Sequence, residues 1–182
     1  MRVTTGTSMR NISDSVISVV TQFGVTTLME TLGQSSAIVS GGVDVQSPSL
    51  ITGHSIFRQR VAGRSDYEAT VNMESRDFTR SFGVPFDNRA GFATGLALLN
   101  LTNDAPANIT VQGVDFANNI LFQGSISLAA LNSTAFDLAG RFPESAGRAG
   151  VVIFASPVFI SGSGFRFNSS GPFTTLPIFS IR

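Results

Sequence analysis

The chain has 182 residues, of which 42% are hydrophobic and 13% are charged. This is enough apolar material for a packed core, with about half of the usual share of charge. Its twelve basic residues, all arginine, balance twelve acidic ones, and the net charge of zero argues against nucleic acid as a partner. Cysteine is absent, which excludes a disulfide framework, and no apolar run approaches the ~20 residues of a membrane span.

The first part of the chain reads as an arm followed by short strands. Residues 1–14 are polar without a period, which predicts a loose arm or a poorly paired strand. After the arm, β-branched and alternating stretches bounded by glycine, serine and proline predict strands at 15–20, 24–32, 43–46, 51–60 and 67–73. Charged residues gather at 74–80, which we interpret as a junction.

The rest of the chain has a denser strand pattern, and a second unit is predicted to open at residues 82–88. Further strands are predicted at 95–101, 109–116, 120–128, 133–138, 150–155, 160–168 and 173–179. Asn118 and Asn119 suit a tight hairpin, because Asn tolerates positive φ. A short helical turn is expected only within residues 141–149.

One pattern occurs twice, in residues 42–58 and 150–166. Both copies contain Gly-Val, an apolar strand, Ser-Pro, Ile-x-Gly and Phe-Arg, and the match extends back to 26–33 over 133–140. An offset of this length is too long for a solenoid repeat and suits β-sandwich modules of about 100 residues. The sequence therefore predicts an all-β protein of two tandem, immunoglobulin-like sandwich modules, at 1–78 and 79–182.

The first module is predicted to lack its opening strands. The second module opens with strands in residues 84–101, and their counterparts in the first copy would fall before residue 1. Either the chain is part of a longer protein or another chain supplies the missing pairing.

Several motifs together resemble a family of uncharacterised bacterial extracellular proteins built of tandem β-sandwich modules. The resembling segments are residues 51–59, 84–88, 91–100, 134–138, 164–168 and 173–177. The resemblance implies a secreted or surface-displayed module with no assigned activity, and the short first module departs from it.

Arg58 and Arg166 each follow Phe in a strand of apolar and small residues. A half-buried guanidinium needs carboxylate or carbonyl oxygens. We expect a structural clamp within each module, to Asp87 or Glu30 in one copy and to Asp137 in the other. A contact between modules or subunits is the alternative.

Five Asn-x-Ser/Thr sequons are candidate glycosylation sites in a host that glycosylates exported proteins. They begin at Asn11, Asn100, Asn108, Asn132 and Asn168.

The residues needed for common catalytic and metal sites are scarce. His54 is the only histidine, and its counterpart in the second copy is Ser163, so the shared motif does not need an imidazole. One His without Cys argues against zinc, and the absence of Lys excludes a P-loop lysine or Schiff base. We expect no enzyme, no cofactor and no metal; a hydrolase would have to use His54 or a carboxylate.

These observations favour an extracellular or cell-surface structural module that self-associates through open sheet edges into a filament or surface layer. The arm at 1–14 and the tail after Phe179 are the expected strand donors. Its partners are then copies of itself or adjoining modules of a longer chain. The alternative is a carbohydrate- or surface-binding adhesion module, although one Tyr and no Trp weaken it.

Overall fold

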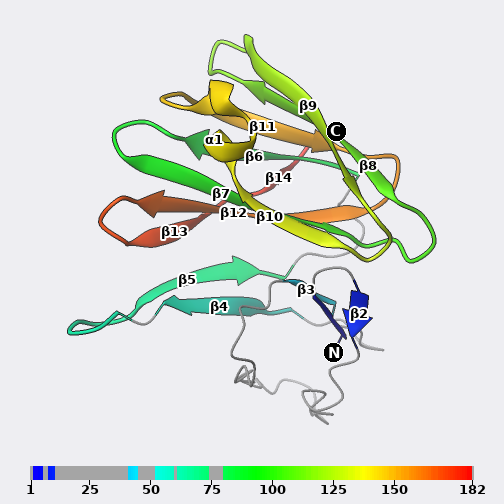
Figure 1. Ribbon diagram of the computed structural model, residues 1–182, viewed down its shortest axis with the longest axis horizontal. Helices are drawn as coiled ribbons and strands as arrows, with labels where there is room; N and C mark the ends of the chain where they lie inside the picture. The colour runs from blue at the N-terminus through cyan, green and yellow to red at the C-terminus, as the bar shows by residue number, and fades with distance from the viewer. Residues whose placement is uncertain are drawn as a thin grey trace.

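The computed structural model is an antiparallel all-β structure (Figure 1). It describes residues 2–5, 8–10, 41–44, 52–59, 61–73 and 80–181. The strands predicted at 15–20 and 24–32 lie outside these residues. Within the described part of the chain, every helix is too short or too polar to cross a bilayer.

Residues 80–181 form two sheets that enclose the core. The five-stranded sheet has the order β14 (Phe179–Ser180), β6 (Ser81–Asp87), β11 (Ala149–Ala155), β8 (Ala107–Val114) and β9 (Ile120–Leu128). The four-stranded sheet has the order β10 (Ser133–Asp137), β7 (Phe92–Asn100), β12 (Ile160–Asn168) and β13 (Phe173–Leu176).

Strict alternation along the strands produces this core. Every second residue is buried in β8 and β11 of the five-stranded sheet and, from Thr94 on, in β7 of the four-stranded sheet, so side chains of both sheets meet between them. Phe82 and Phe154 lie with their ring centroids 5.2 Å apart, and Phe122 stacks on Phe142 at 5.1 Å. The core is therefore aliphatic and phenylalanine-rich, as the composition predicts.

The strand order differs from that of an immunoglobulin domain, in which the last two strands share a sheet. Here the last two strands, β13 and β14, lie in different sheets, and so do the consecutive strands β11 and β12. The immunoglobulin-like part of the prediction is therefore not confirmed. The all-β prediction is confirmed.

Two predicted boundaries differ from the structure, the start of the helical turn and the end of the last strand. The helical turn begins earlier than predicted, as α1 (Leu138–Arg141) and the 3₁₀ turn η3 (Pro143–Ser145). Asp137 caps α1, because its carboxylate accepts from Gly140 N at 2.6 Å. The strand predicted at 173–179 is interrupted at Pro177, where the chain passes from the four-stranded to the five-stranded sheet.

Of the predicted arm, the structure describes residues 2–5 and 8–10, which form strands, so it favours the second of the two predicted alternatives, a paired strand. β1 (Arg2–Thr5) lies between β2 (Ser8–Arg10) and β3 (Gly41–Asp44) in an antiparallel sheet. β4 (His54–Gln59) and β5 (Tyr67–Asn72) then form a hairpin, which lies alongside β12 and β13 in Figure 1.

The two Phe-Arg segments occupy corresponding places. Each lies in the first strand of an antiparallel hairpin, β4–β5 or β12–β13. Phe57 pairs with Ala69 in one ladder, and Phe165 pairs with Thr175 in the other. The two ladders differ in hydrogen-bond register, however, because Phe57 and Ala69 form a hydrogen-bonded pair and Phe165 and Thr175 do not.

Candidate functional site

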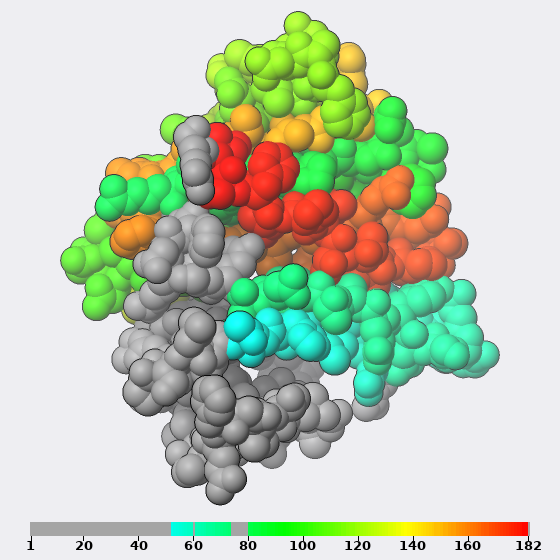
Figure 2. Space-filling model, turned by 180° about the vertical axis from the view of Figure 1, so that it is seen from behind, coloured from blue at the N-terminus to red at the C-terminus, as the bar shows by residue number. Residues whose placement is uncertain are grey.

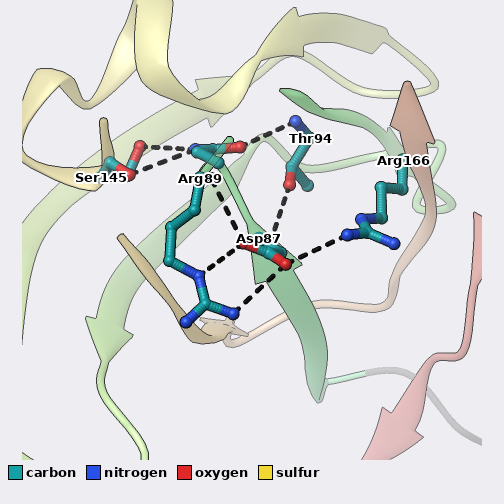
Figure 3. Close-up of polar contacts among 6 residues, drawn as sticks. Asp87, Arg89, Thr94, Ser145 and Arg166 are labelled. Atoms are coloured by element: carbon teal, nitrogen blue, oxygen red, sulfur yellow. Dashed lines mark hydrogen bonds and ion pairs between the residues drawn. The ribbon is translucent and has the colours of Figure 1, made fainter. Parts of the chain in front are cut away.

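The most highly connected polar cluster of the described residues surrounds Asp87, at the end of β6 (Figure 3). The chain turns after Asp87 and enters β7, so Asn88 and Thr94 hydrogen-bond across this turn. Asp87 N donates to Thr94 Oγ1 at 3.2 Å, and Thr94 N donates to Asn88 Oδ1 at 2.8 Å. Asn88 Nδ2 donates to Ser145 Oγ at 3.1 Å, which ties η3 to the turn.

Two arginine guanidinium groups bind the Asp87 carboxylate. Arg89 Nε donates to Oδ1 at 2.8 Å, and Arg166 Nη2 donates to Oδ2 at 3.1 Å. The side-chain hydrogen bond from Arg89 lowers the pKa of Asp87 below its ordinary value of 3.8, assisted by the Arg89 and Arg166 charges and opposed by partial burial. This carboxylate is therefore ionised at neutral pH.

Arg166 also lies over an aromatic ring. Its Cζ is 3.5 Å from the centroid of Phe92, a cation–π contact between β12 and β7. The Arg166 side chain is 32% exposed and the Asp87 side chain is 25% exposed, so water reaches the ion pair only partly. The pair ties β12, in one sheet, to β6, in the other.

This arrangement favours a structural clamp over acid–base chemistry. A carboxylate that two guanidinium groups hold in its charged form is a poor proton acceptor. Ser145 donates no proton to a histidine here, since His54 lies exposed on β4. Within the described ranges no three His, Cys, Asp or Glu residues gather as metal ligands would.

The predicted clamp partners are only partly right. Arg166 pairs with Asp87, not with Asp137, because Asp137 is occupied as the cap of α1. Arg58 pairs with Glu68, the residue opposite it in the β4–β5 ladder, at 2.7 Å. The Arg58 and Glu68 side chains are 52% and 48% exposed, so this pair is not half-buried as expected. The alternative partner Glu30 lies outside the described residues.

The sequons fall in different environments. Asn100 is fully buried, which contradicts its assignment as a glycosylation site. Its Nδ2 donates to the carbonyls of Ala105, Leu128 and Ala129, and its Oδ1 accepts from Thr102 N.

The assignment of the other four sequons as glycosylation sites stays a prediction. Asn108 is exposed and accepts from Ser127 Oγ at 3.1 Å, whereas Asn132 and Asn168 are half-buried. Asn11 lies outside the described residues. The structural role of Asn100 escaped sequence reasoning; the only signal was an Asn at the end of an apolar strand, facing the Asn-Asp-Ala-Pro turn.

A seam separates the two repeated hairpins. The repeat-equivalent residues Phe57 and Phe165 touch each other, edge to face, with ring centroids 5.2 Å apart. Ile56 and Phe57 remain 49% and 44% exposed, so β4 presents apolar surface to solvent.

A pocket of about 380 Å³ lies in this seam. Residues 70–72 of β5 form one side, and residues 175–178, in β13 and just after it, form the other, with Ser163 and Gly164 of β12 beside them. Figure 2 shows the hairpin (cyan to teal) directly against the C-terminal strands (red). Sequence reasoning missed the pocket, because it arises from two segments about 100 residues apart.

Searches of protein-family models, curated proteins and solved structures find no match to the chain.

Proposed function

We propose that the chain is an extracellular structural module that self-associates through an open sheet edge, into a filament or a surface layer. The observation that carries this proposal is the pairing of β4. β12 lies between β7 and β13, whereas its repeat-equivalent β4 has β5 as its only strand partner in the described residues. The edge of β4 that corresponds to the β7 side of β12 is thus the acceptor.

The hydrogen-bond pattern identifies the backbone groups at this edge. Met73 N donates to Gly53 O at 2.8 Å, so Gly53 and Met73 form a hydrogen-bonded pair of the ladder. Such pairs alternate with pairs whose N–H and C=O groups point outward. The outward groups of β4 are therefore those of His54, Ile56 and Arg58.

The edge carries few of the features that block pairing. Soluble proteins protect edges with Lys, Pro or bulges. β4 has no Lys or Pro, it pairs with β5 without a register shift, and its one charge, Arg58, is bound to Glu68. Ile56 adds exposed apolar surface at the centre of the strand.

The expected donors, the arm at 1–14 and the tail after Phe179, already have partners within the chain: β1 pairs with β3, and the tail strand β14 pairs with β6. We therefore propose a different donor. An added strand antiparallel to β4 can instead be the β4 edge of a second copy, which closes a dimer, or a strand from an adjoining module, which propagates.

Two finer parts of the proposal rest on sequence. The tandem-module organisation rests on the sequence repeat. The extracellular location rests on the resemblance to secreted β-sandwich proteins.

An edge-blocking substitution tests the proposal. Ile56→Pro removes an outward N–H without removing a hydrogen bond between β4 and β5. Light scattering and negative-stain microscopy should show oligomers of the native chain and monomers of Ile56→Pro. The control is Thr70→Pro, which makes the same change on the opposite edge of the hairpin and should leave the oligomers intact. A monomeric native chain refutes the proposal.

A further inference from the structure

The five-stranded sheet ends at β9, the longest edge strand of residues 80–181. Its nine residues pair with β8 alone within the described part of the chain, whereas the edge strands β10, β13 and β14 have five, four and two residues. β9 contains no charged residue and no Pro, and the one register shift of its ladder lies near the hairpin tip, between Gly113 and Val114. It thus lacks, along most of its length, the features with which soluble proteins protect an edge.

The hydrogen bonds of the neighbouring strands identify the outward backbone groups of β9. Ser156 N donates to Arg80 O at 2.8 Å, so the even-numbered residues of β11 bond β6 and its odd-numbered residues bond β8. Those odd-numbered residues lie opposite even-numbered residues of β8, so the odd-numbered residues of β8 bond β9, where even-numbered residues lie opposite them. The N–H and C=O groups that point outward from β9 are therefore those of Gln123, Ser125 and Ser127.

These three residues match the three outward residues of β4. In both strands they are two positions apart, so addition of one strand antiparallel to the other brings them opposite one another. The three resulting hydrogen-bonded pairs are Gln123 with Arg58, Ser125 with Ile56, and Ser127 with His54. None of the three side chains from β9 is charged, so no like charge faces Arg58.

The same register joins like faces of the two strands. The side chains of all six paired residues are exposed. The side chains between them face inward: Ile126 is buried in the core, and Phe57 touches Phe165 of β12. A shift by one residue would turn one of the strands over and place its inward side chains on the solvent face. The backbone pattern and the side-chain pattern therefore agree on this pairing.

An apolar contact accompanies the backbone pairing. Gly124 of β9 lies opposite Phe57 in this register, and Phe142 of the same copy as Gly124 covers it: a Cβ added to Gly124 would lie 2.7 Å from Phe142 Cε1. The Phe57 ring is 44% exposed in the single chain, and Gly124 has no side chain to keep it from Phe142. Pairing thus buries Phe57 beside the stacked rings of Phe122 and Phe142 in the other copy.

The two edges lie on opposite sides of the molecule, with β9 at the outer end of the sandwich and hairpin β4–β5 below the sandwich in Figure 1. A chain whose β9 pairs with the next copy keeps its own β4 edge free. Such a head-to-tail contact does not close, so it propagates. Two β4 edges would instead close a dimer and, centred on Ile56, would place Arg58 of each copy opposite His54 of the other.

We infer that β9 of one copy is the strand that pairs with the β4 edge of the next copy, in a head-to-tail contact that extends into a filament. This inference rests on the proposed self-association and names its donor strand. Main-chain hydrogen bonds supply the affinity, and the contact of Phe57 with Gly124 and Phe142 selects the register.

Two edge-blocked variants that complement each other test the donor. Ser125→Pro removes an outward N–H of β9 without removing a hydrogen bond between β8 and β9, and Ile56→Pro does the same on β4. By light scattering, the native chain should form open-ended oligomers, and each variant alone should be monomeric. An equimolar mixture should contain a species of twice the monomer mass and no larger one, because one intact β9 edge and one intact β4 edge remain. In that mixture, the amide NMR signals of His54, Ile56 and Arg58 of ¹⁵N-labelled Ser125→Pro should shift.

Ser125→Lys is the second variant, because it keeps every backbone N–H and changes only an exposed side chain. A Lys there would face Ile56 beside Arg58, and it should raise the concentration at which oligomers form by about fivefold or more. Asn108→Lys is the matched control. It adds the same charge at an exposed position on β8, which already has a strand on each side, and it should assemble like the native chain.

Oligomers of Ser125→Pro like those of the native chain overturn the inference and leave the proposed function standing, as does a mixture of the two Pro variants that stays monomeric. Native dimers that persist in Ser125→Pro indicate pairing of two β4 edges and also overturn it. If Ser125→Pro does not fold, the inference fails when Ser125→Lys assembles like Asn108→Lys. A monomeric native chain refutes the proposed function and this inference together.

Discussion

Truncating Arg166 to Ala tests the clamp between the two sheets. The change removes the 3.1 Å hydrogen bond to Asp87 and the 3.5 Å contact with the Phe92 ring. The ion pair is about one-third exposed and Arg89 still neutralises Asp87, so we assign it about 1 kcal/mol. The cation–π contact and the lost packing add about 1 kcal/mol. The free energy of unfolding should therefore fall by about 2 kcal/mol.

The repeat provides a matched control. Arg58 occupies the corresponding place in β4, but it and Glu68 are about half exposed. Arg58→Ala should therefore reduce the free energy of unfolding by only about 0.5 kcal/mol. For a chain of this size, Tm should fall by about 4–8 °C for Arg166→Ala and by about 1–2 °C for Arg58→Ala. Calorimetry of both variants measures this, and equal Tm shifts would refute the argument that partial burial strengthens the Arg166 clamp.

Three further substitutions, one of them with a matched control, test the fold and its pH dependence. Asn100→Ala leaves three carbonyls without their donor and should lower the free energy of unfolding in urea by about 3–4 kcal/mol. The control Asn108→Ala, at an exposed position, should change it by no more than about 0.5 kcal/mol. Similar values for the two variants would contradict the buried network. Because the pKa of Asp87 is lowered in the folded state, its contribution is complete at neutral pH and is lost as pH falls below 3.8. Asp87→Asn should therefore have a lower Tm at pH 7 and a smaller loss of Tm on acidification than the native chain, and parallel pH curves would contradict this. Gly150→Ala would place a Cβ against the backbone oxygen of Val114 and should lower the free energy of unfolding by about 2–3 kcal/mol in the same assay. An unchanged urea midpoint would contradict the close approach of the two backbones.

Strand positions in residues 80–181 follow closely from the sequence. The strands predicted at 120–128 and 160–168 coincide with β9 and β12. β9 follows the Asn118-Asn119 turn and β12 precedes the Ser169-Ser170-Gly171 turn, so these turn residues indicate one boundary of each strand. Asn118 has φ of 64°, as its place in a predicted tight hairpin requires.

Which strands pair cannot be read from the same pattern. Alternation shows which residues face a core, but it does not determine the neighbour, so the places of β6 and β12 differ from the immunoglobulin order. The clamp illustrates the same limit. Asp87 and Asp137 both follow apolar strands, and only the packing of β6 against β12 decides that Asp87 meets Arg166.

Other features of the candidate site also depend on contacts between residues that are far apart in the sequence. The Phe-Arg repeat was visible in the sequence, but the contact between Phe57 and Phe165, and the pocket beside it, arise from the docking of one hairpin on the other. Asn100 looked like a surface sequon, because nothing local indicates that three carbonyls converge on its amide.

Amide hydrogen exchange at β4 tests the central claim most directly. The N–H of Ile56 points away from β5, so it should exchange freely in dilute solution and become protected at high concentration, when a strand of another copy pairs with it. Protection that rises with concentration at Ile56, but not at Thr70 on the opposite edge, is the predicted result. An Ile56 amide that exchanges at the same rate at both concentrations would contradict self-association through this edge.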